Sequence, residues 1–193
     1  MKVLVACEFS GIVRDAFIAR GHDAWSCDIL PTEKPGPHIQ GDVLEILNDG
    51  WDLMIAHPPC TYLTNSGVRW LFEKEGRWGQ LNDGVSFFNK LRNADIPKKC
   101  IENPVPHKWA LERIGIKYNC KIHPWEFGHK QKKTTCLWLM GLSPLMPTCI
   151  VGPPPKGDKS WESIWRCPPG PEQKKIRSRT FPGIAQAMAN QWG

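Results

Sequence analysis

WDLMIAHPPC, residues Trp51 to Cys60, joins a short apolar run to a rigid, polar end. The run from Leu53 to Ala56 predicts a buried strand. The strand ends at His57, because the prolines that follow lack a backbone donor and have a fixed φ. Cys60 therefore sits on a stiff turn at the carboxyl end of a strand, where open α/β sheets place ligands and reactive groups. Because free cysteines are often only small buried hydrophobes, this stretch alone leaves simple packing as an equal interpretation.

The chain on either side of this stretch alternates between strands and helices. Lys2 to Cys7 predicts a first strand, Ile12 to Arg20 has apolar residues at helical spacing, and Ala24 to Cys27 predicts a second strand. Val43 to Leu47 predicts a short helix before Trp51. This alternation indicates an α/β fold with a mostly parallel sheet and helices on both faces. Further helices are predicted at 80–92 and 109–114, and further strands at 96–102, 118–123 and 135–140.

Length and composition predict a single globular domain. The 193 residues suffice for one domain with a real core and are too few for two of ordinary size. Hydrophobic residues make up 41% and charged residues 23%, as in ordinary soluble proteins, and no apolar run approaches the roughly 18 residues of a membrane helix. The N-terminal residues read as a strand rather than a signal peptide, so we expect a cytoplasmic protein that has no membrane partner.

The cysteine count and the net charge bear on metals and partners. The eight cysteines follow no export signal, which favours reduced thiols over a disulfide framework. Cys120 and His123 resemble half of a zinc site, but the spacing of the other cysteines is irregular and no second pair completes it, so we expect no metal. The net charge of +6 favours a polyanionic partner.

Polar residues end three of the predicted strands. Asp28 ends the second strand after a glycine-containing turn at Gly11, the pattern in which a carboxylate takes a ribose hydroxyl of a nucleotide cofactor. Cys60 and Glu102 end two later strands. In a parallel sheet these ends share one edge, so a thiol and a carboxyl beside a cofactor cleft predict covalent catalysis with proton transfer. Asp42 fits equally well as the N-cap of the short helix that follows it.

Two segments have no strand pattern. Residues 61–79 are polar and aromatic, and their length favours an active-site loop. Residues 141–180 form a small basic insertion rich in proline and glycine, in which Trp161 and Trp165 are suited to stacking on bases while the lysines and arginines contact phosphates. A solvated basic loop whose tryptophans pack on the domain is an equal alternative.

The ordered motifs resemble the DNA cytosine-5 methyltransferase family over about residues 3–140 and 180–192. Single motifs are weak evidence, whereas their order and spacing together are much stronger. In chain order the motifs are Phe9-Ser10-Gly11-Ile12, Cys27-Asp28, Gly41-Asp42-Val43, Asp52 to Cys60, Glu102-Asn103-Pro104-Val105, Gly128 to Leu139 with Gln131-Lys132-Lys133, and Phe181 to Trp192.

The resemblance implies a Rossmann-like, S-adenosylmethionine-dependent methyltransferase of phage-like size that methylates carbon 5 of cytosine in duplex or single-stranded DNA. It implies that Cys60 is the nucleophile and that Glu102 stabilises ring nitrogen 3. The implied cofactor-binding residues are Phe9, Ser10, Gly11, Asp28, Asp42, His57 and Pro58. The implied substrate-binding residues are Asn103, Gln131 and Lys133.

The chain departs from the family's pattern in ways that keep other functions open. Val13 stands where a second glycine is usual, Thr61 follows the catalytic cysteine in place of glutamine, and Lys133 and Thr135 stand where arginines are expected. No large target recognition domain is present, which leaves room for a protein partner that supplies target recognition. The alternatives are modification of a free pyrimidine nucleotide, transfer of a group other than methyl, and non-catalytic binding of S-adenosylmethionine or nucleic acid.

Overall fold

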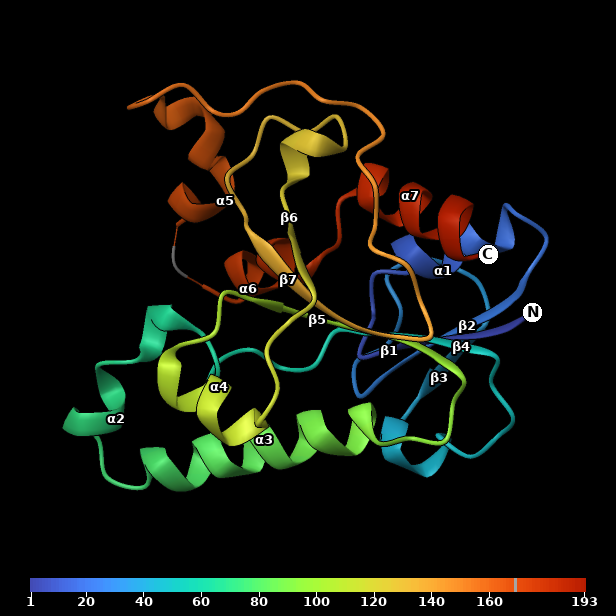
Figure 1. Cartoon of the computed structure of the whole chain (residues 1–193), viewed down its shortest axis with the longest axis horizontal. Coiled ribbons are helices and arrows are strands. Elements are labelled where there is room, and N and C mark those ends of the chain that lie inside the picture. Colours follow the sequence, from blue (N-terminus) through green and yellow to red (C-terminus); the bar gives the residue numbers. More distant parts are fainter. Residues whose placement is uncertain (169) are drawn as a thin grey trace.

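The computed structural model describes residues 1–168 and 170–193, and its centre is one seven-stranded sheet in the order β3-β2-β1-β4-β5-β7-β6 (Figure 1). The pairs from β3 through β5 are parallel, and β7 runs antiparallel to both β5 and β6. The strands are β1 (Lys2–Ala6), β2 (Asp23–Asp28), β3 (His38–Gln40), β4 (Leu53–Ala56), β5 (Lys98–Pro104), β6 (Cys120–Ile122) and β7 (Thr135–Met140).

Helices cover both faces of this sheet (Figure 1). On one face lie α1 (Ile12–Ile18) and α7 (Pro182–Trp192), and on the other lie α3 (Arg77–Arg92) and α4 (Lys108–Ile114). The smaller helices are α2 (Trp70–Glu73), α5 (Ser163–Arg166) and α6 (Pro171–Ser178), with 3₁₀ helices at Val43–Glu45, Asn65–Gly67, Pro124–Glu126 and Lys159–Glu162.

The central strand β4 shows why the sheet needs both layers. All of its side chains are buried, and successive side chains of a strand point to opposite faces. Met54 and Ala56 pack in the cluster under α3 and α4, whereas Leu53 and Ile55 pack in the cluster under α1 and α7. A strand buried on both faces reads as a continuous apolar run, as this one does. The expected Rossmann-like α/β fold, with a mostly parallel sheet and helices on both faces, is confirmed.

The structure differs from the sequence-based expectation in the loops. Residues 61–79 are not an irregular loop throughout, because they contain a 3₁₀ helix and α2, which buries Leu71, and α3 already begins at Arg77. Gly76, with a left-handed φ of 71°, allows this early start. Within residues 141–180 the structure places α5 and α6, which the composition did not predict. The side chain of Trp165 lies outside the described residues.

The parallel order brings the carboxyl ends of β2, β1, β4 and β5 to one edge. The backbone N–H of His57 donates to the carbonyl of Ala6 at 2.9 Å, which extends the pairing of β4 with β1 by one step beyond the strand. Cys7, which follows β1, has a left-handed φ of 58°, a conformation uncommon outside glycine. The chain therefore turns sharply at the edge where the predicted site residues gather. Along the described residues, no helix combines the length and apolar character required to cross a bilayer.

Candidate active site

The turn after β1 is held by the carboxylate of Glu8, whose residue is only 4% exposed. One oxygen, Oε1, accepts from the backbone N–H of Val13 at 2.8 Å and from the hydroxyl of Ser10 at 3.0 Å. Oε2 accepts from the backbone N–H of Arg14 at 3.2 Å. These N–H groups open α1 and have no partner within the helix, so Glu8 caps it. Sequence reasoning missed Glu8, although an acidic residue just before a helix start is a recognisable signal.

Val13 and Arg14 follow this turn. Val13 stands at the position where a second glycine was expected. Val13 is fully buried and packs with Phe17 in the core beneath α1. The Arg14 guanidinium is also fully buried and donates to the carbonyls of Lys34 and Pro35 at 3.3 and 3.1 Å. Val13 therefore serves the core, and Arg14 fastens the proline-rich loop after β2 against the turn.

The two aspartates predicted to bind cofactor differ in burial, because Asp28 is partly buried and Asp42 is exposed. Asp28 ends β2, and one oxygen accepts from the backbone N–H of Leu30 at 2.9 Å. Burial raises the pKa of Asp28, and the Leu30 N–H and the nearby His38 oppose that rise. Asp42 is exposed, and its Oδ1 accepts from the backbone N–H of Leu44 at 2.9 Å. The predicted N-cap role of Asp42 is confirmed.

The Cys60 turn is closed by its own backbone. The carbonyl of Cys60 accepts from the N–H groups of Leu63 and Thr64 at 3.0 and 3.2 Å. The buried His107, at the start of α4, donates from Nε2 to the carbonyl of Tyr62 at 3.0 Å and from its backbone N–H to the carbonyl of Leu63 at 3.0 Å. Its Nδ1 accepts from Ala110 N–H at 3.0 Å, which makes the ring a helix cap. His107, which the sequence did not single out, thus ties the cysteine turn to the segment that follows β5.

The surroundings of the Cys60 thiol set its protonation. Burial raises the pKa of Cys60, and the Glu102 carboxylate raises it further. The positive charges of Lys133 and Arg177 lower it, without outweighing burial. The resting group is therefore a thiol, and a nucleophilic role requires that its proton be removed.

Glu102, on β5, faces the His57 ring across the edge of the sheet. The His57 Nδ1 and the Glu102 Oε1 are 3.8 Å apart, and these side chains are 8% and 19% exposed. Burial acts to raise the pKa of Glu102, but the His57 ring and the Lys133 ammonium outweigh it, so the pKa is lowered. Glu102 is therefore ionised in the resting site.

Two pockets open at this edge, and His57 and Thr180 line both of them. The larger, the acceptor pocket, encloses about 280 Å³ including space open to solvent, and the smaller, the turn pocket, about 190 Å³. Cys60 follows the pocket-lining His57 closely in the sequence, but Cys60 itself lines neither pocket. The acceptor pocket is lined by His57, Glu102, Ile122, Lys133, Thr135, Thr180, Phe181, Ile184 and Met188, and the turn pocket by Cys7, Glu8, Phe9, Ser10, His57, Ser178 and Thr180.

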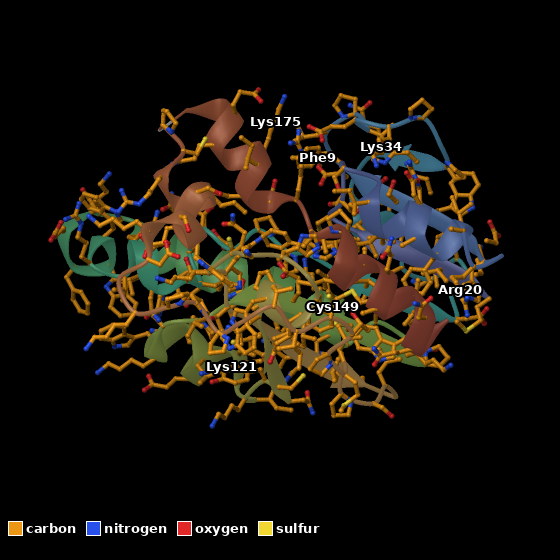
Figure 2. The ribbon with its side chains drawn as sticks, turned by 90° about the horizontal axis from the view of Figure 1, so that it is seen from above. Phe9, Arg20, Lys34, Lys121, Cys149 and Lys175 are labelled. Atoms are coloured by element: carbon orange, nitrogen blue, oxygen red, sulfur yellow. The ribbon has the colours of Figure 1, made fainter. Side chains whose placement is uncertain are left out.

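The segment Arg177 to Thr180, here called the strap, lies over the turn pocket. The Arg179 guanidinium donates to both oxygens of Glu33 at 2.8 and 2.7 Å, and the Lys133 ammonium donates to the Arg177 carbonyl at 2.7 Å. The N–H of Glu33 in turn donates to the carbonyl of Phe9 at 2.8 Å. Figure 2 accordingly shows Phe9 between α6, which carries Lys175, and the loop that carries Lys34. The strap thus joins residues distant in sequence across the turn pocket.

Of the three residues predicted to bind substrate, only Lys133 lines the acceptor pocket. Asn103 is fully buried, and its side chain donates to the carbonyl of Pro104 at 2.6 Å. The Gln131 side chain donates to the Ser163 hydroxyl at 2.7 Å, toward α5. Pro58, predicted to bind cofactor, is buried and lines neither pocket.

Several basic side chains of the insertion form ion pairs within the protein. Arg166 pairs with Glu162, Lys175 pairs with Glu172, and Arg179 pairs with Glu33. Trp161 is buried rather than free to stack. Among residues 1–168 and 170–193, no group of three metal-ligating side chains comes together, and the eight cysteines are free.

Comparison with known proteins yields fold similarity only. No protein-family model matches the chain, and no curated protein does. One similar solved structure, from E. coli, is described as a DNA modification methyltransferase encoded within a prophage; it is 18% identical, with a TM-score of 0.47 over 80% of this chain and 53% of that chain. Another is the Entamoeba histolytica methyltransferase EhMeth, 13% identical, with a TM-score of 0.47 over 80% of this chain and 57% of that chain. The chain thus spans little more than half the length of these two proteins, and at this level of similarity neither assigns it an activity.

Proposed function

We propose that the protein transfers a methyl group from S-adenosylmethionine to carbon 5 of cytosine in DNA, through a covalent adduct with Cys60. The observation that supports this most is the edge of the sheet where the turn after β1, the Cys60 turn and Glu102 come together; Glu102 lies within β5, which continues to Pro104 rather than ending at Glu102 as predicted. The turn pocket and the acceptor pocket meet there at His57. A methyl donor and an acceptor base need such adjoining pockets.

The residues around the turn pocket suit the methyl donor. Phe9 and Ser10 line it, and Gly11, with a left-handed φ of 69°, brings the backbone around without a side chain. Asp28 lies at the neighbouring strand end, where a carboxylate suits a ribose hydroxyl, and its Oδ1 accepts from the backbone N–H of Leu30. When bound, S-adenosylmethionine supplies an electrophilic methyl group on its sulfonium sulfur. Asp42 caps the following 3₁₀ helix through Oδ1, just as Asp28 accepts from Leu30 through Oδ1, and in this proposal its carboxylate remains the partner of the adenine amine.

The chemistry of the acceptor begins at the Cys60 thiol. Carbon 5 of cytosine is a poor nucleophile, so a thiolate must first add to carbon 6 and convert the ring into an enamine. Because the pKa of Cys60 is raised, the thiol must give up its proton as the base binds. The thiol proton passes to water, and the Lys133 and Arg177 charges lower the pKa of Cys60 and so favour the thiolate that remains.

Glu102 stabilises the negative charge that this addition creates on the ring. Electrons displaced from the ring collect on nitrogen 3, and a proton shared with Glu102 neutralises them. After methyl transfer, carbon 5 loses its proton to water, the Cys60 sulfur leaves, and the aromatic ring is restored. In duplex DNA the cytosine has to leave the stack to reach these groups.

A free pyrimidine nucleotide is the second candidate substrate. The pairing of Arg166, Lys175 and Arg179 with carboxylates favours it, because these side chains then offer less to DNA phosphates. If DNA is the substrate, a protein partner would supply the target recognition surface that the small insertion lacks.

The decisive experiment supplies methyl-labelled S-adenosylmethionine with duplex DNA, single-stranded DNA or dCMP, and compares the wild type with Cys60→Ser. We expect label on DNA, at carbon 5 of cytosine after digestion, and a loss of at least about 1,000-fold in the variant, because the serine hydroxyl is a far weaker nucleophile. Cys149→Ser, at an exposed cysteine, is the matched control and should keep full activity.

Each other outcome separates the candidates. Label only on dCMP would show that the substrate is a free nucleotide rather than DNA. Label that persists in Cys60→Ser rules out the covalent mechanism. Absence of label on every acceptor, while calorimetry shows S-adenosylmethionine binding, favours a binding protein.

A further inference from the structure

The His57 ring lies where the acceptor pocket and the turn pocket meet, and it lines both. Its side chain is 8% exposed. Within the described part of the chain, neither ring nitrogen has a hydrogen-bond partner. Buried polar atoms in folded proteins are nearly always satisfied, so two unsatisfied nitrogens beside two pockets indicate a functional demand on the ring.

The Glu102 carboxylate lies close to this ring. The 3.8 Å between Nδ1 of His57 and Oε1 of Glu102 is an ion-pair distance, somewhat longer than a hydrogen bond. The pairing of β4 with β5 reaches Ala56 and Ile101, so His57 and Glu102 are the next residues on the two neighbouring segments, although β5 itself continues to Pro104. The sheet therefore places an imidazole beside a carboxylate at the acceptor pocket.

We propose that His57 holds the proton that Glu102 delivers to ring nitrogen 3 of the target pyrimidine. His57 is then a positioning residue that acts through Glu102 rather than on the substrate. The inference rests on the proposed function and deepens it by assigning the source of the proton. It also gives the ring a role distinct from binding cofactor.

The proton and electron movements balance. As the Cys60 thiolate forms its bond to carbon 6, the carbon 5–carbon 6 double-bond pair moves between carbons 4 and 5, and the pair between carbon 4 and nitrogen 3 moves onto nitrogen 3. Nitrogen 3 takes a proton from Glu102, and Glu102 takes the Nδ1 proton of His57, which becomes neutral. When the Cys60 sulfur leaves, nitrogen 3 returns its proton by the same route.

The charges around His57 explain why Glu102 needs this partner. Glu102 is ionised in the resting site, so it has no proton of its own to give. A protonated imidazole beside it supplies one without moving a charge through solvent. The titratable groups that face His57 are Glu102 on β5, Asp28 at the end of β2, Cys7 and Glu8 after β1, and Lys133 before β7.

The first test needs no catalysis. The Glu102 carboxyl carbon is titrated by ¹³C NMR in the wild type, in His57→Gln and in His22→Gln, a distant histidine that serves as control. Removing His57 should raise the pKa of Glu102 by about one unit, roughly a tenfold change in proton affinity, and His22→Gln should leave it unchanged. An unchanged titration in His57→Gln overturns the pairing. His57→Asn is the second variant should glutamine disturb folding.

The second test follows the release of tritium from carbon 5 of cytosine in DNA and in dCMP, without S-adenosylmethionine. Enamine formation by Cys60 lets carbon 5 exchange its hydrogen with water, so release reports addition and nitrogen protonation alone. We expect wild-type release to fall at alkaline pH as the His57–Glu102 pair loses its proton. His57→Gln should be about 100-fold slower, with that alkaline fall displaced.

The outcomes distinguish the two proposals. Release with the wild-type rate and pH profile in His57→Gln overturns the role of His57 while leaving the proposed function standing. No release by the wild type from either substrate overturns the proposed function, and the proton delivery with it, whatever the titration shows. Release that depends on both Cys60 and His57 supports both.

Discussion

Glu8 illustrates how one carboxylate sets the shape of the turn pocket. It accepts from the Ser10 hydroxyl and from the first N–H groups of α1, so the turn and the helix share one buried acceptor. A buried acceptor that serves several donors is costly to remove, because each donor is then left unsatisfied. The geometry of Phe9 to Gly11 therefore depends on a residue outside the motif that drew attention to them.

Replacing Glu8 by alanine should lower the free energy of unfolding by about 1–3 kcal/mol, because buried N–H groups lose their acceptor. Binding of S-adenosylmethionine should weaken as the turn loses its shape. Urea unfolding and isothermal calorimetry measure the two effects, and Glu75→Ala, at an exposed glutamate, is the control. Reduced stability with unchanged binding would show that the turn does not form the cofactor site.

At the scale of elements, His107 fastens the Cys60 turn to α4. Because Nδ1 accepts from Ala110 N–H while Nε2 donates to the Tyr62 carbonyl, the ring must be neutral. Burial lowers the pKa of His107, and the neighbouring Arg113 and Arg77 lower it as well, against the opposing effect of the Tyr62 carbonyl. The link between the two elements is thus sensitive to acid.

The free energy of unfolding should fall as the pH drops below about 6.5, the ordinary pKa of histidine. Below that pH the unfolded chain binds a proton that the folded His107 resists, so protonation favours unfolding. Urea unfolding between about pH 5 and pH 8 measures the slope. His107→Asn keeps an N-cap acceptor and should reduce the slope without abolishing it, because burial also lowers the pKa of His22 and His129. An unchanged slope would exclude His107 as its source.

The elements also show where sequence reasoning reaches its limit. The strands with apolar runs, such as β4 and β7, were predicted closely because burial on both faces leaves a clear pattern. The edge strand β3, His-Ile-Gln, was missed because it is short, polar and only partly buried. The helix α6 was missed because its helical pattern lies in a segment rich in proline and basic residues, where no apolar stripe marks a core face.

At the scale of the molecule, the sequence predicted that Cys60 and Glu102 share an edge, because the carboxyl ends of parallel strands must. It did not predict that His57 faces Glu102, since that depends on side-chain directions at two strand ends. Nor did it predict that Arg179 forms an ion pair with Glu33, which is far from it in the sequence. Such contacts are set by how the last segments fold back over the sheet, which local patterns do not encode.

The strap is the last piece of this assembly, and breaking it should affect the turn pocket more than overall stability. The Arg179–Glu33 pair is partly exposed, with side chains 37% and 28% accessible, so its loss should cost about 1 kcal/mol or less. Because Ser178 and Thr180 line the turn pocket, Arg179→Ala should weaken S-adenosylmethionine binding by up to roughly fivefold. Added salt should weaken the wild type toward the variant, because salt screens an exposed pair.

Calorimetric titrations at low and high salt measure this effect. Arg166→Ala is the matched control, since Arg166 pairs with Glu162 within its own segment and not across the pocket. Equal affinities for the wild type and Arg179→Ala would mean that the strap merely covers the pocket. A loss confined to Arg179→Ala, and absent at high salt, would show that a single exposed ion pair lets the end of the chain complete a site begun by its first strand.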